Sequence, residues 1–333
     1  MLRVFLITKE GEELFGELTI EDKAYFVEKE VKEIDCIVTP TFFNSHVHLG
    51  DSVAKDPEFM DLEKLVGPNG YKFRILKETN RDEIVSCMKN SIDVALNSGT
   101  TNLAEFREGG IEGLKLLNEA DEMNVCIKLA RPSSIEEAEL MLKQNANGFG
   151  MSSVRDHEFS FLEELRDIAR KRNVIFAIHA GERDNDDVER ALSLEPDLLI
   201  HMNMADVKSL KAAMDEEIPI VSCLRSNAFF NLLNNKNYDI LSDYRLWLIG
   251  TDNVMVASPN IISEMNFASY IIKKDKKIFC AVTRGFDVFS CKTGLILFHT
   301  KKNLYKANSI RSIVRRANAN DILQVLHKEL VLE

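Results

Sequence analysis

The chain has 333 residues, 45% of them hydrophobic, which is enough for one large barrel or two average domains with a closed core. Its formal net charge of −11 disfavours nucleic acid and anionic membrane surfaces as partners, and no apolar run in the sequence is long enough to span a membrane. Six cysteines are scattered without a CxxC pair, which favours free thiols and a cytoplasmic location.

The predicted elements change in character along the chain. Residues 1–38 have the pattern of short strands separated by charged turns. From residue 39 onward, strands and helices alternate. We expect strands at 36–46, 100–106, 125–130, 147–152, 174–179, 197–201, 218–223 and 246–252. We expect helices at 81–97, 110–123, 134–145, 158–172, 184–194, 205–216, 232–244 and 260–273.

This alternation is typical of an α/β protein with a (β/α)₈ TIM barrel. An open doubly wound sheet would need a glycine-rich phosphate loop after its first strand, and the sequence has none there. Segment 50–80 is long for a βα loop, so we expect it to be a lid or a binding element. Strand signals return after about residue 290, and a charged helix is predicted near 319–330.

Both chain ends therefore carry short strands that can pair with each other. The sequence predicts a barrel over residues 39–290. It also predicts a small composite β domain built from the N- and C-terminal segments, residues 1–38 and 291–333.

Imidazole and carboxylate side chains stand at the ends of several predicted strands. His46 and His48 are two residues apart, so both point to the same side of a strand. His179, His201 and Asp252 each close a short apolar run. Because the strands of a barrel end at one common face, we expect the five side chains to converge there. Imidazole nitrogen and carboxylate oxygen suit Zn or Fe(II), so the pattern predicts a metal-dependent hydrolase.

Residues 179–182, with the sequence HAGE, add a candidate proton carrier. Gly181 allows a sharp turn after the strand, so Glu182 can fold back over the site. A carboxylate near the metal-activated water, but not itself a ligand, is the usual proton carrier of zinc hydrolysis. The alternative is a surface glutamate in a βα loop. Asp252, if buried, needs a partner, which the metal or His201 could supply.

These motifs resemble those of the amidohydrolase superfamily, specifically its mononuclear aminohydrolases, the adenosine and cytosine deaminase and chlorohydrolase branch. The resemblance runs from about Thr39 to Cys291. NSHVH at 44–48 is similar to the strand-one signature, and HAGE at 179–182 is similar to the adenosine deaminase motif. SCLRSN at 222–227 resembles the strand-seven CPxSN element, with leucine in place of proline, and GTDN at 250–253 resembles the strand-eight region. The familiar C-terminal GxxADLV stretch is missing from the sequence.

The resemblance implies one divalent transition metal, with Zn expected and Fe(II) as the alternative. Its implied ligands are four residues: His46, His48, His179 and Asp252. Glu182 is then the proton shuttle, His201 contacts the catalytic water or the substrate, and Asp252 helps to deprotonate the water. Many binuclear relatives carry a carbamylated lysine at the end of strand four. Here residues 148–153 contain no lysine, so one metal is expected rather than two.

The expected activity is hydrolytic deamination of an amino-substituted, purine- or pyrimidine-like heterocycle. One alternative is hydrolysis of a cyclic amide C–N bond or a C–Cl bond by the same water. Another is a barrel that retains metal without catalysis, against which Glu182 argues, because a structural site needs no proton carrier. The sequence leaves open whether the chain forms a homo-oligomer, and which of six residues contact substrate: Glu105, Arg107, Arg131, Arg155, His157 and Arg225.

Overall fold

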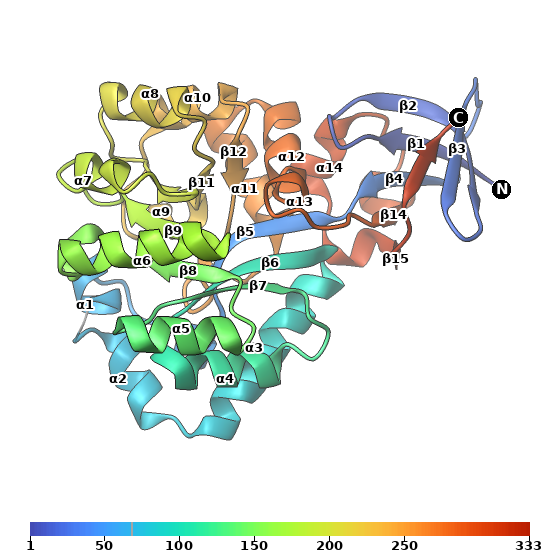
Figure 1. The fold of residues 1–333 in the computed structure, drawn as a ribbon. Coiled ribbons are helices and arrows are strands. Elements are labelled where there is room, and N and C mark those ends of the chain that lie inside the picture. The colour runs from blue at the N-terminus through green and yellow to red at the C-terminus, as the bar shows by residue number, and fades with distance from the viewer. Residues whose placement is uncertain (68) are drawn as a thin grey trace. The chain divides into compact units, whose positions relative to one another are not determined.

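The computed structural model describes residues 1–67 and 69–333 (Figure 1). The chain divides into two compact units. One unit consists of Met1–Asn44, Ala95–Asn102 and Asn260–Glu333, and the other of Ser45–Val94 and Leu103–Pro259. Among the described residues, no helix combines the length and hydropathy needed to cross a membrane.

The larger sheet is a closed parallel barrel. Its strands follow one another in chain order: β5 (Phe42–His48), β6 (Thr100–Arg107), β7 (Cys126–Ala130), β8 (Gly148–Met151), β9 (Ile175–Ala180), β10 (Leu198–His201), β11 (Ile220–Ser222), β12 (Trp247–Ile249) and β13 (Asp252–Asn253). Only two residues separate β12 from β13. Since β12 pairs with β11 and β13 pairs in parallel with β5, this last strand closes the barrel. The predicted (β/α)₈ barrel is confirmed.

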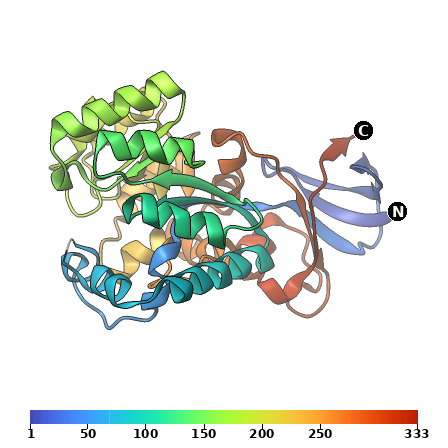
Figure 2. The same ribbon diagram turned by 60° about the horizontal axis from the view of Figure 1, so that its bottom comes forward.

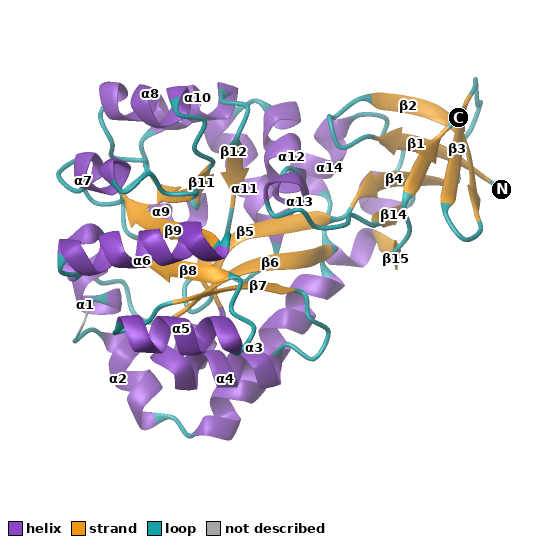
Figure 3. Ribbon diagram, viewed as in Figure 1, coloured by secondary structure: helices purple, strands orange, loops and turns teal. Residues whose placement is uncertain are grey.

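Helices alternate with these strands and lie on their outer side (Figure 3). Helices α4, α6 and α7 pack against β7, β8 and β9. The helices that precede residue 260 are α1 (Leu62–Val66), α2 (Tyr71–Glu78), α3 (Arg81–Asn97), α4 (Gly110–Ala120), α5 (Ile135–Lys143), α6 (Phe159–Arg172), α7 (Val188–Ser193), α8 (Val207–Asp215), α9 (Leu224–Phe229) and α10 (Asn235–Asp243). Capping side chains fix the starts of α5, α8 and α10: Ser134 accepts from the backbone of Glu137, Asp206 from that of Ser209, and Asn234 from that of Asn237.

The described part of the long segment between β5 and α3 forms short helices. It contains the 3₁₀ helix η1 (Leu49–Ala54), α1 and α2. Ala54, Leu65 and Met255 form a buried apolar cluster that ties this segment to the loop after β13. The segment is therefore held on the face of the barrel where the strands end.

The second sheet joins both chain ends, as predicted (Figures 1 and 2). Its strand order is β15 (Ile322–Leu326), β14 (Leu295–His299), β4 (Cys36–Pro40), β1 (Leu2–Ile7), β2 (Glu13–Ile20), β3 (Ala24–Glu28) and β16 (Leu330–Leu332). Its buried face includes Val4, Leu18, Phe26, Val38 and Leu297. The limits of this domain, set at residues 38 and 291 from the sequence, stay a prediction.

Helices α11 (Ile261–Ile272), α12 (Asp275–Thr283), α13 (Gly285–Val288) and α14 (Ile310–Arg316) belong to the same unit as this sheet. The sequence predicted only the first of them. The helix predicted near 319–330 is wrong, because 322–326 pairs in antiparallel fashion with β14, and 330–332 pairs with β3. Cross-strand pairing outweighs the helical tendency of a short charged segment.

Candidate metal centre and active site

Five side chains singled out in the sequence lie together at the carboxyl ends of the barrel strands. His46 Nε2 lies 3.2 Å from His179 Nε2 and 3.2 Å from Asp252 Oδ1. His48 Nε2 lies 3.5 Å from the same carboxylate oxygen. Two overlapping groups, His46–His48–His179 and His46–His201–Asp252, each bring their ligand atoms within 4.8 Å of one another. Strands β5, β9, β10 and β13 supply these residues.

Backbone carbonyls orient two of the imidazoles. His48 Nδ1 donates to the carbonyl of Phe106 over 3.0 Å, and His179 Nδ1 donates to that of Met151 over 2.7 Å. Because a carbonyl can only accept, the proton is on Nδ1, and the lone pair of Nε2 faces the cluster. Burial lowers the pKa of His46 to about 3 and also lowers the pKa values of His48 and His179. The imidazoles are therefore neutral, as a metal ligand must be.

This donor set fits a divalent transition metal. Buried His46 and half-buried His179 point ring nitrogens at each other over 3.2 Å, close to the buried carboxylate of Asp252. Burial raises the pKa of Asp252, but its neighbours His46 and His201 outweigh burial and hold it well below the usual range. Several electron-pair donors therefore lie close together with few protons between them. A bound cation would remove the repulsion between these lone pairs.

The backbone at two of these positions is unusual. His201 has φ 78° and Asp252 has φ 61°, in the left-handed region that residues other than glycine rarely adopt. Such outliers cluster at functional sites. Ser226 Oγ, on α9, donates to Asp252 Oδ2 over 2.5 Å and fixes that carboxylate from the side.

Glu182 lies beside the cluster but belongs to neither candidate ligand group among the described residues. It follows Gly181, whose φ of 62° makes the turn after β9. Its Oε1 lies 3.6 Å from His201 Nε2, and its side chain is 20% exposed. Burial raises the pKa of Glu182 to about 7; the charge of Asp252 adds to the rise and His201 opposes it. A carboxyl with this pKa can both accept and donate a proton near neutral pH.

A buried ionic cluster behind His48 was not predicted from the sequence. Lys72 of α2 contacts Glu108, and its Nζ lies 3.5 Å from Asp51 Oδ2. Arg107 Nη2 lies 3.1 Å from Glu108 Oε2, which in turn is 3.5 Å from His48 Nδ1. All five residues are buried. Alternation at the end of β6 could have pointed to Glu108, but nothing local marks Lys72 as its partner.

Two candidate substrate contacts belong to this cluster instead. Glu105 accepts from the backbone N–H of Leu49 over 2.7 Å and lies 3.4 Å from Arg107. Arg107 passes so close to Gly50 that a Cβ there would meet its guanidinium at 1.8 Å. Both side chains are fully engaged inside the protein, so they hold the strand ends in place.

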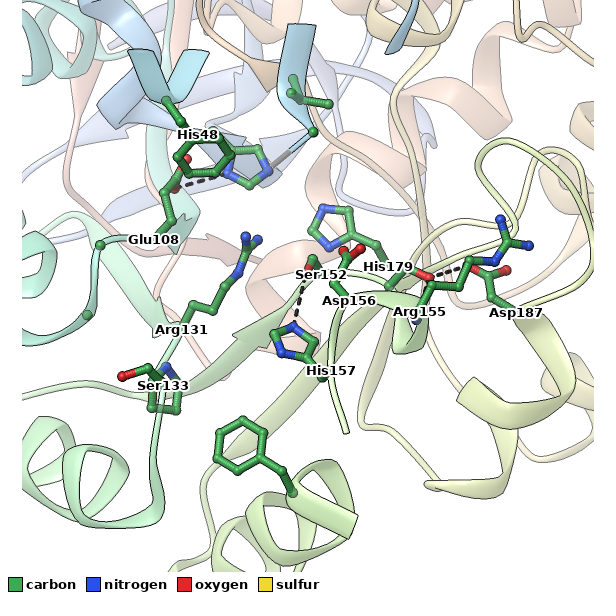
Figure 4. A pocket seen from close by; sticks show the side chains of 18 of the residues that line it. His48, Glu108, Arg131, Ser133, Ser152, Arg155, Asp156, His157, His179 and Asp187 are labelled. Atoms are coloured by element: carbon green, nitrogen blue, oxygen red, sulfur yellow. Dashed lines mark hydrogen bonds and ion pairs between the residues drawn. The ribbon is translucent and has the colours of Figure 1, made fainter. Parts of the chain in front are cut away.

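A cavity of about 1330 Å³ opens over the site and is shown in Figure 4. Of the six residues left open from the sequence, Arg131, Arg155 and His157 line it. His157 Nε2 lies 2.9 Å from Ser152 Oγ. Arg225 is not part of the lining and donates to the carbonyl of Ser258 over 2.7 Å.

Comparison with known proteins agrees with the fold and the site. Residues 37–277 match the amidohydrolase family. A protein of Archaeoglobus fulgidus named "Putative aminohydrolase" is 42% identical over 322 residues, which cover 96% of this chain and 95% of that protein.

Two solved structures share the fold. The guanine deaminase from C. acetobutylicum, with bound guanine, has a TM-score of 0.77 at 14% identity and covers 98% of both chains. The atrazine chlorohydrolase from Arthrobacter aurescens TC1, complexed with zinc, has a TM-score of 0.75 at 13% identity and covers 99% of this chain and 96% of that one. The protein is thus a barrel hydrolase of the amidohydrolase superfamily. The chain belongs to the amidohydrolase family, and the resemblance seen in its motifs is confirmed.

Proposed function

We propose that the protein is a metal-dependent hydrolytic deaminase of an amino-substituted, purine- or pyrimidine-like heterocycle. The observation that carries the proposal is Glu182, a carboxyl with a pKa near 7 that lies at the edge of a convergent ligand set without joining it. The 42% identical relative bears an aminohydrolase name, and a guanine deaminase shares the fold, which supports the same class.

One zinc ion, or Fe(II) in its place, would be held by His46, His48, His179 and Asp252, whose ligand atoms converge. When bound, the metal would lower the pKa of a water molecule toward neutrality. The second-site lysine is missing from β8, which supports a single ion.

The protein's own groups then handle the protons. In our proposal His201 and Asp252 orient the attacking water, and Glu182 accepts its proton. The water oxygen bonds to the ring carbon that carries the amino group, while Glu182 passes that proton to the adjacent ring nitrogen. The remaining proton of the added hydroxyl then moves through the same carboxyl to the amino nitrogen as the C–N bond breaks and the C=O bond forms. Ammonia and the oxo-substituted ring are the products.

Hydrolysis of a C–Cl or cyclic amide bond is the second candidate, because a chlorohydrolase shares the fold over nearly the whole chain. A barrel that keeps a metal without catalysis is disfavoured, since a structural site has no use for Glu182. We also propose a cytoplasmic protein without nucleic acid or membrane partners, on the strength of its net charge of −11 and scattered cysteines. Assembly into a homo-oligomer stays open.

The test is a screen of zinc- and iron-loaded protein for ammonia release from nucleobases, nucleosides and pterins, with chloride release from chlorotriazines measured in parallel. Ammonia release that disappears in Glu182→Gln supports the proposal. Chloride release alone, or no turnover of any compound, contradicts it.

A further inference from the structure

Among the residues that the structure describes, Arg131 is a cation of the cavity wall without an acidic partner. Arg131 follows β7, where its backbone N–H donates to the carbonyl of Arg107 over 2.9 Å. Its side chain is partly buried and lines the cavity, with the guanidinium directed toward His48 and His179 (Figure 4). Among the described residues, its side chain makes one long hydrogen bond, from Nε to the carbonyl of Gly150 over 3.5 Å. Both terminal Nη groups are left available to the cavity.

The other lysine and arginine side chains that line the cavity in the described structure are paired. Lys72 contacts Glu108 and Asp51. Arg155 and Arg183 both pair with Asp184, the latter over 3.2 Å. Each of these three cations therefore already has an acidic partner within the protein.

Two carboxylates, Glu108 and Asp156, act on the charge of Arg131, but in the described part of the chain neither forms an ion pair with it. Glu108 is held by Lys72 and by Arg107 at 3.1 Å. Asp156 is exposed, and its charge affects Arg131 only at longer range. Arg131 thus keeps a full positive charge in a partly buried place. This is unfavourable unless a ligand supplies a negative charge and hydrogen-bond acceptors to the guanidinium.

We propose that Arg131 binds an oxyanion substituent of the substrate, a carboxylate or phosphate carried on or close to the heterocycle. The proposal rests on the proposed function and narrows it to anionic heterocyclic amines. A guanidinium presents its Nη groups in a plane that matches two oxygens of a carboxylate or a phosphate. The cavity volume of about 1330 Å³ exceeds the volume typical of pockets that bind a drug-sized ligand. The cavity therefore has room for a ring with such a substituent.

The test measures binding rather than turnover. Glu182→Gln serves as the inert host, and calorimetry compares matched pairs: pterin-6-carboxylate with pterin, and adenosine 5′-monophosphate with adenosine. We expect an anionic member to bind more tightly than its neutral partner, and the pair that shows this tells carboxylate from phosphate. Adding Arg131→Met should weaken binding of that member about 10- to 100-fold and leave the neutral one within about threefold. Adding Arg155→Met, the matched control, should change neither.

Three results would overturn the proposal. No anionic member binds more tightly than its partner, or Arg131→Met weakens both members equally, or Arg155→Met has the same effect as Arg131→Met. A fourth measurement needs no ligand: Arg131→Met should keep the melting temperature of the parent, and a loss of several degrees would assign Arg131 a structural role instead. If no compound releases ammonia but the anionic preference is found, the deaminase proposal fails while the oxyanion site stands.

Discussion

Replacing Glu182 with glutamine is the sharpest test of the proposed chemistry. The substitution keeps the size and hydrogen-bonding shape of the side chain and removes its titratable proton. Proton transfer by a positioned group contributes about 10²–10⁴-fold to rate, equivalent to about 3–5 kcal/mol in activation free energy. We therefore expect kcat to fall at least about 100-fold while metal content stays at the wild-type level.

The raised pKa of Glu182 gives the same variant a second signature, in stability. A carboxyl whose pKa rises on folding stabilises the fold below its unfolded value, and this contribution is lost as the pH rises through the folded value. For Glu182 the shift from 4.5 to about 7 corresponds to about 3 kcal/mol lost between those pH values. Glu182→Gln should remove this loss, so the metal-free variant should equal or exceed wild type in stability at pH 8. A glutamate with a structural role would give the opposite result.

The assays are ammonia release for kcat, elemental analysis for metal, and denaturant unfolding at pH 5 and pH 8. Glu158→Gln is the matched control, because Glu158 lines the same cavity but is exposed. Near-wild-type turnover in Glu182→Gln would refute the proton-shuttle mechanism. Loss of the metal would instead make Glu182 a ligand.

Four further predictions follow from the site and the cysteines. His179→Ala should lower bound metal from one ion per chain to near zero by elemental analysis, whereas two tightly held ions in the wild type would contradict the single-metal proposal. Ser226→Ala removes the 2.5 Å hydrogen bond to Asp252 and should weaken metal binding about tenfold or more in a chelator competition; unchanged affinity would show that this bond does not position the carboxylate. Burial raises the pKa of Glu105 to about 8, so the metal-free protein should lose stability between about pH 4.5 and 8, and Glu105→Gln should flatten this profile in denaturant titrations; parallel profiles would argue against it. All six thiols should react under denaturing, non-reducing conditions, and fewer than four free groups would contradict the free-thiol prediction.

The barrel could be predicted because its signals are local. Strands buried on both faces appear as short continuous apolar runs, and the helices between them have their own periodicity. The site residues terminate those runs, so their convergence follows from the way parallel strands share one end. His46 and His48 add direct evidence, since alternate residues of a strand face the same side. The family resemblance agrees with this reading.

What could not be predicted depends on contacts between distant segments. Lys72 lies in α2, within a segment that the sequence predicts as a long loop, and its partner Glu108 is brought to it only by the fold. The six candidate substrate contacts could be sorted only once their partners were visible, as Arg107 and Arg131 illustrate. Likewise 36–46 reads as one strand but divides at Thr41 into β4 and β5, which join different sheets. No local propensity signals that change of sheet.

Some features of the site lower the stability of the fold and are explained by function instead. Left-handed backbone at a residue other than glycine costs about 1–3 kcal/mol, and both His201 and Asp252 adopt it at the ends of their strands. Next to them Glu182 is partly buried with its pKa raised to about 7, and Glu105 is buried with its pKa raised to about 8, so ionising either one further lowers stability. These two backbone conformations and two raised carboxyl pKa values lie at one face of the barrel, and the strands beneath are largely buried. A chain selected for stability alone would relax such positions, for example with glycine at the strand ends and amides in place of the buried acids. That a carboxyl with a raised pKa and two such backbone conformations meet at one ligand set is a physical argument, separate from any resemblance, for placing the chemistry there.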